Sequence, residues 1–134
     1  MQAVPTWENY RKQTRSKPRR VTLAAFDEPG LWFEVVSGGS NTLADIAAIE
    51  KRFQERFTEA QAQLGETRLP FILLAQDVEK IVAWNFGPLP SDDLAVLTTI
   101  PEAVLWFIKD QIDDYTLEMI PPKYRRRLER ALES

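Results

Sequence analysis

Residues 20–36, RVTLAAFDEPGLWFEVV, decide the fold class of this chain. Apolar residues occupy every second position on both sides of Asp27-Glu28-Pro29-Gly30, a tetrapeptide typical of a turn. A period of two indicates half-buried strands, so we expect a β-hairpin over this stretch. Because an isolated hairpin is only marginally stable, we also expect it to pack on another element or to gain a third strand.

The next segment, residues 43–64, predicts one long helix, because it has no proline or glycine and its apolar residues recur every three or four positions. Asn41 or Thr42 can cap this helix, and with Thr42 as the cap, Asp45 supplies the acidic side chain at the third helical position. Gly65 is a natural stop. At roughly 1.5 Å per residue such a helix is about 33 Å long.

The apolar stripe of this helix is a candidate contact surface. Its members are Leu43, Ile46, Ile49, Phe53, Phe57, Ala60 and Leu64. The helix is long for a chain of 134 residues. We therefore expect part of the stripe, with Phe53 and Phe57, to contact a second copy or another protein.

The second half of the chain predicts further helices. The apolar run 71–86 follows Pro70 and fits a helix with proline in its first turn; two strands are the alternative. Three more helices are expected: 92–97 behind Ser91, a longer one that Thr98 or Thr99 caps and that carries Pro101 in its first turn, and 123–132. The sequence thus predicts an α+β fold, mostly helical, with an N-terminal β-hairpin followed by four to five helices.

Charge is divided unevenly along the chain, although the formal net charge is only −3. Residues 1–20 carry six basic side chains and one acidic, whereas residues 27–118 carry seventeen acidic and six basic. The expected organisation is a basic N-terminal tail at 1–19, a hairpin plus helical domain at 20–120 and a basic C-terminal helix at 121–134. The basic ends suit nucleic-acid contact, but we favour ends that are solvated or pair with the acidic body, since that body would repel phosphates.

Composition excludes several kinds of chemistry. The chain has no cysteine and no histidine, which removes a disulfide scaffold, a thiolate metal site and a Ser-His-Asp triad. The helix dipole explains Asp92-Asp93, and no calcium-loop pattern occurs. We expect a protein that is not an enzyme and has no catalytic residue, metal or cofactor. With no signal-peptide core and no apolar run near the roughly 20 residues that span a bilayer, we expect a cytoplasmic location and no membrane contact.

Three large aromatic side chains of the second half are further contact candidates. Trp84 ends an apolar run, where a Trp is more often core than ligand contact. Trp106 and Phe107 are neighbours in an expected helix and point about 100° apart, so both cannot enter one core stripe. One of them should meet the hairpin, another helix or a partner. The candidate partner-binding residues are therefore Phe53, Phe57, Trp84, Trp106 and Phe107.

Residues 81–86, IVAWNF, followed by Gly-Pro-Leu-Pro, a short acidic stretch and residues 100–105, IPEAVL, resemble tail assembly chaperones of long-tailed bacteriophages. Members of that family often have a helix ending in a Trp-Asn-aliphatic motif, a loop ending in Leu-Pro and then a helix introduced by a proline. The expected hairpin and long helix are also similar to such proteins. The resemblance covers roughly residues 20–120.

The resemblance implies a non-catalytic function. Such chaperones coat the long, hydrophobic, helical tape measure protein, keep it soluble until the tail tube polymerises around it, and are then displaced. The implied partners are the tape measure protein, the tail tube protein as a second candidate, and further copies of this chain in a homo-oligomer, all in the host cytoplasm. The alternative hypothesis is a small nucleic-acid-associated regulatory protein that uses its basic ends.

Overall fold

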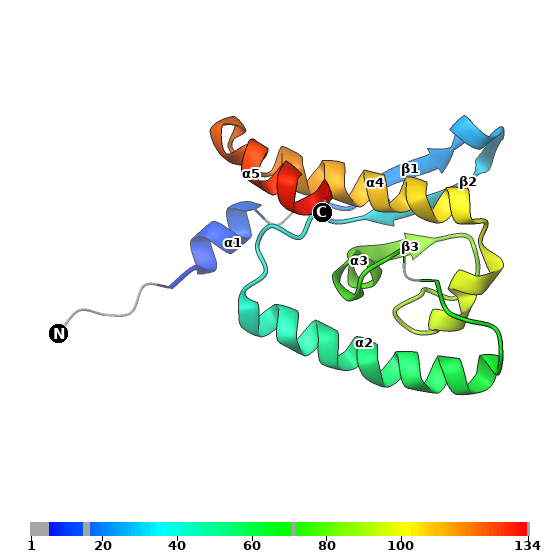
Figure 1. The fold of residues 1–134 in the computed structure, drawn as a ribbon. Helices are drawn as coiled ribbons and strands as arrows, with labels where there is room; N and C mark the ends of the chain where they lie inside the picture. Colours follow the sequence, from blue (N-terminus) through cyan, green and yellow to red (C-terminus); the bar gives the residue numbers. More distant parts are fainter. Residues whose placement is uncertain (1–5, 15–16, 71, 134) are drawn as a thin grey trace.

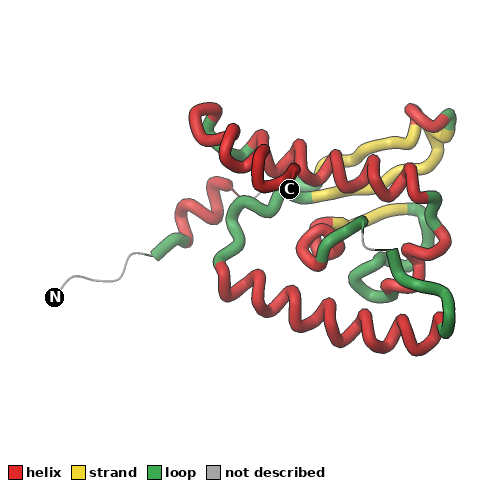
Figure 2. Tube along the Cα trace, viewed as in Figure 1, coloured by secondary structure: helices red, strands yellow, loops and turns green. Residues whose placement is uncertain are grey.

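Three antiparallel strands form a small sheet in the order β1-β2-β3. They are β1 (Arg19–Leu23), β2 (Glu28–Val35) and β3 (Ile81–Trp84). The helices are α1 (Glu8–Thr14), α2 (Leu43–Leu64), α3 (Ala75–Lys80), α4 (Glu102–Glu118) and α5 (Pro122–Glu133), with short 3-10 helices η1 (Ala24–Phe26) and η2 (Leu94–Thr99). This computed structural model describes residues 6–14, 17–70 and 72–133 (Figures 1 and 2). The predicted α+β class, with a hairpin near the N-terminus and helices after it, is confirmed.

The hairpin turn lies earlier than the sequence predicts. The β1–β2 register shifts between Thr22 and Leu23, and the chain reverses through η1 and Asp27 rather than through Pro29-Gly30, which belongs to β2. Asp27 has a φ of 60°, and its N–H donates to the Ala24 carbonyl at 3.0 Å. Because aspartate tolerates the left-handed conformation better than most residues, this turn does not need the glycine.

The predicted helix over 71–86 is wrong in its second half. The helix α3 ends at Lys80, and the chain continues as β3, in which Ile81 faces Val35 and Trp84 faces Phe33. Residue 71 lies outside the described residues. The β-branched and aromatic side chains of β3 suit a strand, and a continued helix would leave one edge of β2 unpaired. This segment therefore supplies the third strand that the hairpin was expected to gain.

The long helix α2 begins and ends where the sequence predicts. The Thr42 hydroxyl accepts the Asp45 N–H at 3.2 Å, and the Asp45 carboxylate accepts the Thr42 N–H at 3.0 Å, which completes a capping box. Gly65 ends the helix with a φ of 63°, a value that favours glycine. These local signals define both helix ends.

The apolar stripe of α2 faces mainly this chain's own core. Ile49 and Ala60 are buried, and Phe53 and Phe57 pack against the core, with their ring centroids 6.0 Å apart. Leu43, at the start of the helix, is 85% exposed. Phe53 and Phe57 are therefore partly buried against this chain's own core, and a contact of either ring with a partner stays a prediction.

The helix α4 buries the apolar side that the sequence predicts: Val104, Leu105, Ile108, Ile112 and Tyr115. Its start differs from the prediction, since Pro101 precedes the first turn. Thr98 and Thr99 do not cap it; their hydroxyls donate to carbonyls of the 3-10 helix η2 at 2.7 and 2.6 Å. This 3-10 helix stands in place of the α-helix predicted at 92–97, and Asp93 rather than Ser91 caps it.

The core lies between two long helices. Figure 1 shows α4 along one side of the molecule and α2 along the other, with α3 and β3 between them. Fully buried side chains come from the sheet, from η2 and from α4: Phe33, Val35, Ile81, Leu94, Ile108 and Ile112. The open end of this arrangement, where the hairpin tip meets the start of α4, carries the candidate site.

The helix α1 lies at the opposite end of the molecule from the hairpin tip (Figure 1). The Arg11 N–H donates to the Trp7 carbonyl at 2.8 Å, so the helical turn starts behind Trp7. The Trp7 and Tyr10 rings meet edge to face with centroids 5.9 Å apart. The Arg11 guanidinium pairs with Asp45 at 2.8 Å, which links α1 to the first turn of α2.

Candidate functional site

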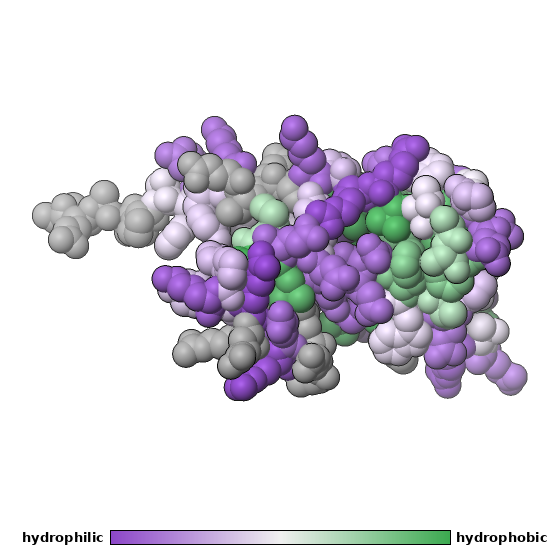
Figure 3. Space-filling model, turned by 90° about the horizontal axis from the view of Figure 1, so that it is seen from above, coloured by the Kyte–Doolittle hydropathy of each residue, from purple (hydrophilic) through white to green (hydrophobic). Residues whose placement is uncertain are grey.

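An apolar groove of about 450 Å³ opens where the hairpin tip meets the start of α4. The hairpin supplies Leu23, Phe26, Glu28 and Leu31, and the opposite wall consists of Phe86, Thr99, Ile100, Pro101, Ala103 and Val104. Figure 3 shows hydrophobic residues gathered at this end of the molecule. Binding pockets typically have volumes of about 300–1,000 Å³, so the groove has room for several apolar side chains of another molecule.

Phe107 supports the groove by packing behind its hairpin wall. Its ring packs edge-on against Phe26 of the hairpin tip, with centroids 5.4 Å apart, and against Phe33 of the sheet at 6.1 Å. Edge-to-face aromatic pairs add stability beyond their buried area, so these contacts hold the hairpin tip against α4. The sequence predicts that one of the two neighbouring rings in α4 meets the hairpin, another helix or a partner; Phe107 meets the hairpin.

Trp106 lies beside the groove rather than beneath it. Its side chain is 49% exposed, and the indole N–H donates to the Glu102 carboxylate at 3.4 Å. Residues three apart on a helix are neighbours, so Trp106 follows the groove residue Ala103 on the same side of α4. Trp106 therefore extends the apolar surface from the groove along the helix.

Asn85 fixes the hairpin wall of the groove. Its side-chain amide donates to the Gly30 carbonyl at 2.8 Å and accepts the Trp32 N–H at 2.9 Å. These two bonds hold the backbone on both sides of Leu31, whose side chain lines the groove. Asn85, the second residue of the Trp-Asn motif, thus positions the wall of the candidate site without lining the groove itself.

Trp84 belongs to the core, which corrects its assignment as a partner-binding residue. It is 8% exposed, and its indole N–H donates to the carbonyls of Gly87 at 3.1 Å and Pro88 at 3.0 Å. These bonds hold the start of the loop behind the groove residue Phe86. A Trp that ends an apolar run is more often core than ligand contact, and Trp84 is such a core residue.

The structure does not bring the five predicted partner-binding residues together. Trp84 is buried, Phe53 and Phe57 are partly buried against the core, Phe107 supports the groove, and Trp106 is the one exposed residue of the five, at 49%. Most groove residues were missed because they are single side chains on separate strands, helices and loops. The one available signal was their presence in the two stretches, 81–86 and 100–105, that carry the family resemblance.

The mouth of the groove is acidic. Glu28 alone is charged among the described residues that line it. Asp27 precedes Glu28, and Glu102 lies between the groove residues Pro101 and Ala103; all three carboxylates belong to exposed residues. The groove therefore favours an apolar ligand whose flanking charges are positive.

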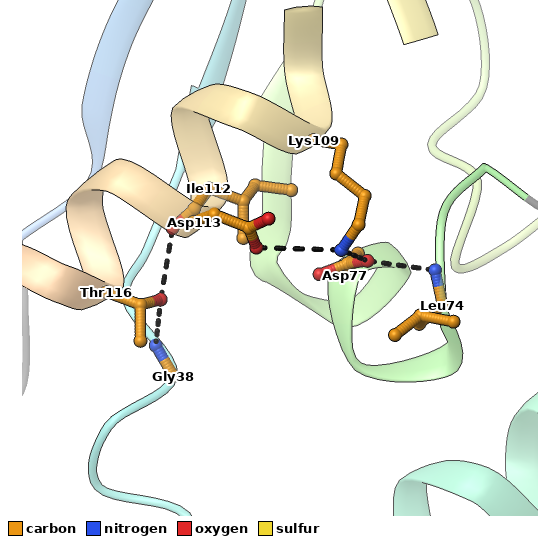
Figure 4. A network of polar contacts seen from close by, with 7 residues as sticks. All are labelled: Gly38, Leu74, Asp77, Lys109, Ile112, Asp113 and Thr116. Carbon is orange, nitrogen blue, oxygen red and sulfur yellow. Dashed lines mark hydrogen bonds and ion pairs between the residues drawn. The ribbon is translucent and has the colours of Figure 1, made fainter. Parts of the chain in front are cut away.

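Figure 4 shows a second candidate, a cluster of charged side chains between α3 and α4. The Asp77 carboxylate, in a residue only 3% exposed, accepts the Leu74 N–H at 2.9 Å and the Lys109 ammonium at 3.0 Å. Lys109 also reaches Asp113 at 3.5 Å. A buried carboxylate requires such partners, because an unpaired charge in the interior is strongly unfavourable.

Burial shifts the pKa values in this cluster. It lowers the pKa of Lys80, although Asp77 and Asp113 oppose the shift. It raises the pKa of Asp113, which Lys109 opposes. Burial also disfavours charged Lys109, but its bonds to Asp77 and Asp113 outweigh that effect, and its pKa rises.

The cluster joins α3 to α4 and has the arrangement of a structural contact rather than of a catalytic site. A lysine with a lowered pKa is a candidate nucleophile or base, but Lys80 does not line the groove, and its side chain lies against the backbone of Gly38. The Thr116 hydroxyl accepts the Gly38 N–H at 3.4 Å and donates to the Ile112 carbonyl at 3.0 Å, so α4 holds this loop as well (Figure 4). Within residues 6–14, 17–70 and 72–133, no group of three or more acidic side chains could hold a metal ion.

Arginines of the N-terminal segment pair with the acidic body. Arg19 pairs with Glu118 and stacks over the Tyr115 ring, with its guanidinium carbon 3.9 Å from the centroid. Arg20 pairs with Glu34 at 2.8 Å and stacks over Trp32 at 3.8 Å. These contacts agree with the favoured interpretation of the basic N-terminal end.

No helix in the described part of the chain is long and apolar enough to cross a membrane. Comparisons of the sequence and the fold with protein-family models, curated proteins and solved structures give no significant match.

Proposed function

We propose that this protein is a non-catalytic assembly chaperone that holds an apolar helical segment of a client protein in the groove at the hairpin tip. The groove carries the proposal: its walls are apolar, and Trp106 continues the apolar surface along α4. An amphipathic helix that lays its apolar face in a groove is a recurring mode of protein recognition. Each fully buried large side chain of such a client contributes roughly 1.5–3 kcal/mol.

Following the family resemblance, the proposed client is the tape measure protein of a long-tailed phage, with the tail tube protein as a second candidate partner. The resemblance and the groove coincide in the sequence. The stretches 81–86 and 100–105 supply half of the lining: Phe86, Ile100, Pro101, Ala103 and Val104. A long apolar helix aggregates in water unless its apolar face is covered, and that need gives the chaperone its function in the host cytoplasm.

The nucleic-acid hypothesis has less support. A nucleic-acid contact needs basic side chains that are available to phosphates, whereas Arg11, Arg19 and Arg20 each pair with a carboxylate of the body. A shift of duplex DNA that weakens steeply with salt would favour this alternative over the chaperone.

Co-expression with the tape measure protein tests the chaperone proposal. The measurements are the soluble fraction of the client and its recovery with the tagged chaperone. Ala103→Arg places a long charged side chain in the groove at an exposed helical position, and Ala47→Arg makes the same change on the exposed side of α2. We expect Ala103→Arg to abolish recovery and Ala47→Arg to leave it unchanged. Equal recovery with both variants, or none with the unmodified chain, would reject the proposal.

A further inference from the structure

Trp7 is the most exposed large aromatic side chain of the described residues: its exposure is 61%, against 54% for Tyr124 and 49% for Trp106. It forms an aromatic pair with Tyr10, three residues further on, at the start of α1. Glu8, Arg11 and Lys12 of the same helix line a polar hollow with Ser40 and Asn41, so polar side chains of α1 face the body. The Trp7 ring is therefore the part of this segment that has most apolar surface to bury.

The apolar groove is the surface that suits this ring. Trp and Tyr bury about 150–250 Å² each in a contact, and the groove offers about 450 Å³ between apolar walls. The mouth carries the carboxylates of Asp27, Glu28 and Glu102, and α1 keeps the exposed Lys12 as a positive side chain after Arg11 has paired with Asp45. Two residues three apart on a helical turn are the usual anchors of a helix in a groove.

A chain cannot fill its own groove with its own α1. Figure 1 places α1 at one end of the molecule and the hairpin tip at the other. The Arg11–Asp45 ion pair at 2.8 Å holds α1 beside the start of α2. The two complementary surfaces are thus kept apart within one copy but are both present on every copy.

We infer that the Trp7–Tyr10 face of α1 docks in the apolar groove of a second copy of this chain, so that copies associate head to tail. Such a contact joins two different surfaces. Each added copy therefore leaves one unoccupied groove at one end and one undocked Trp7–Tyr10 face at the other. The association goes beyond the proposed function, because it requires no client. Where a client is present, it competes with α1 for the groove, so client binding and self-association exclude each other at the same site.

Sedimentation of the full chain over a wide range of concentrations tests the inference. Three single variants are compared with the unmodified protein. Trp7→Ser removes the docking ring, and Ala103→Arg blocks the groove. Tyr124→Ser, the control, changes an aromatic residue of similar exposure, 54%, on α5. We expect the first two to raise the dissociation constant by about tenfold or more, since truncating a central aromatic anchor removes a dominant part of the binding energy. Tyr124→Ser should associate like the unmodified chain, and circular dichroism should show equal helix content in all four proteins.

Mixing the two defective variants separates this arrangement from any symmetric one. The Trp7→Ser chain keeps an intact groove and the Ala103→Arg chain keeps an intact α1, so an equimolar mixture should form a dimer that neither forms alone and should grow no further. A symmetric contact between identical surfaces predicts no such rescue. A monomeric unmodified chain, unchanged association of Trp7→Ser, loss of association in Tyr124→Ser, or a mixture without dimers would each overturn the inference. Client recovery with Trp7→Ser is scored separately, because the proposed function requires it to persist even if self-association is lost.

Discussion

Asn85 is bound to Trp32 by two hydrogen bonds, as a partner residue in a strand would be. The Asn85 N–H donates to the Trp32 carbonyl at 3.2 Å, and the Asn85 side-chain oxygen accepts the Trp32 N–H at 2.9 Å. Strand β3 ends at Trp84, and at the next residue the Asn85 side chain makes a hydrogen bond to β2 that a strand backbone would otherwise make. It thereby keeps the segment around Leu31 in line, and that segment forms one wall of the groove.

Replacing Asn85 by Ala should loosen this wall. The change removes the side-chain bonds to Trp32 and Gly30, and because a net hydrogen bond contributes about 1 kcal/mol, we expect the free energy of unfolding to fall by roughly 1–2 kcal/mol. Urea unfolding measures this loss. Asn85→Asp keeps the acceptor for the Trp32 N–H and should lose less stability than Asn85→Ala. Equal stability of Asn85→Ala and the unmodified chain would contradict the role assigned to the Asn85 side chain.

Lys109→Met should be among the most damaging single changes. It leaves the buried Asp77 carboxylate without its cation, and breaking a buried ion pair typically costs about 3–5 kcal/mol. Adding Asp77→Asn should recover part of the loss, since the amide oxygen still accepts the Leu74 N–H. Arg52→Met is the matched control, because its pair with Glu79 is half exposed and is worth at most about 1 kcal/mol. Similar losses of unfolding free energy for Lys109→Met and Arg52→Met would contradict a stabilising role of the Asp77–Lys109 pair.

Asp113 should give the stability of the fold a defined pH dependence. Its folded-state pKa is raised by burial, against the opposing charge of Lys109. The folded state therefore takes up this proton at a higher pH than the unfolded chain does, so the contribution of Asp113 to stability grows as the pH falls through the raised pKa. We expect the stability of the unmodified chain relative to Asp113→Asn to increase from neutral pH down to the ordinary value of 3.8 and then to level off. Urea unfolding at a series of pH values measures this difference; a difference that stays constant or shrinks toward acid pH contradicts the prediction.

Two neighbouring glycines should respond differently to alanine. A Cβ at Gly38 would lie 2.2 Å from Cε and 2.5 Å from Nζ of Lys80, whereas at Gly39 the nearest atom would be 3.9 Å away, on Ile120. Alanine at Gly39 mainly restricts the unfolded chain, but at Gly38 it also displaces the Lys80 ammonium from its place near Asp77 and Asp113. We expect Gly38→Ala to be less stable than Gly39→Ala by about 1 kcal/mol in thermal and urea unfolding. The opposite order would show that Lys80 is free to move.

Trp106→Lys tests the apolar surface beside the groove. The ring is half exposed, so the change should leave helix content and stability nearly unaltered. Recovery of the client should fall by about tenfold, because the indole extends the apolar surface that contacts the client. Tyr124→Lys, at an exposed ring on α5, is the control and should bind the client normally. Unchanged client binding by Trp106→Lys would confine the contact to the groove itself.

The sequence by itself determined the elements that depend on neighbours in the chain. The capping box of Thr42 and Asp45, the stop at Gly65 and the buried side of α4 all result from residues a few positions apart. Hydrogen bonds within a helix and side chains three or four positions apart act over this short range, so their pattern is readable without a structure. The existence of a hairpin could be predicted for the same reason.

Only the tertiary structure decided how the elements use each other. The residues of β3 could form a helix or a strand, and the open edge of β2 determined the outcome. Phe107 and Trp106 have equal claims to burial in the sequence, but Phe26 and Phe33 lie where only Phe107 reaches them. The groove and the Asp77–Lys109 pair likewise join segments more than thirty residues apart. Burial and strand pairing depend on which distant segments meet in space, and no local pattern of a single sequence contains that information.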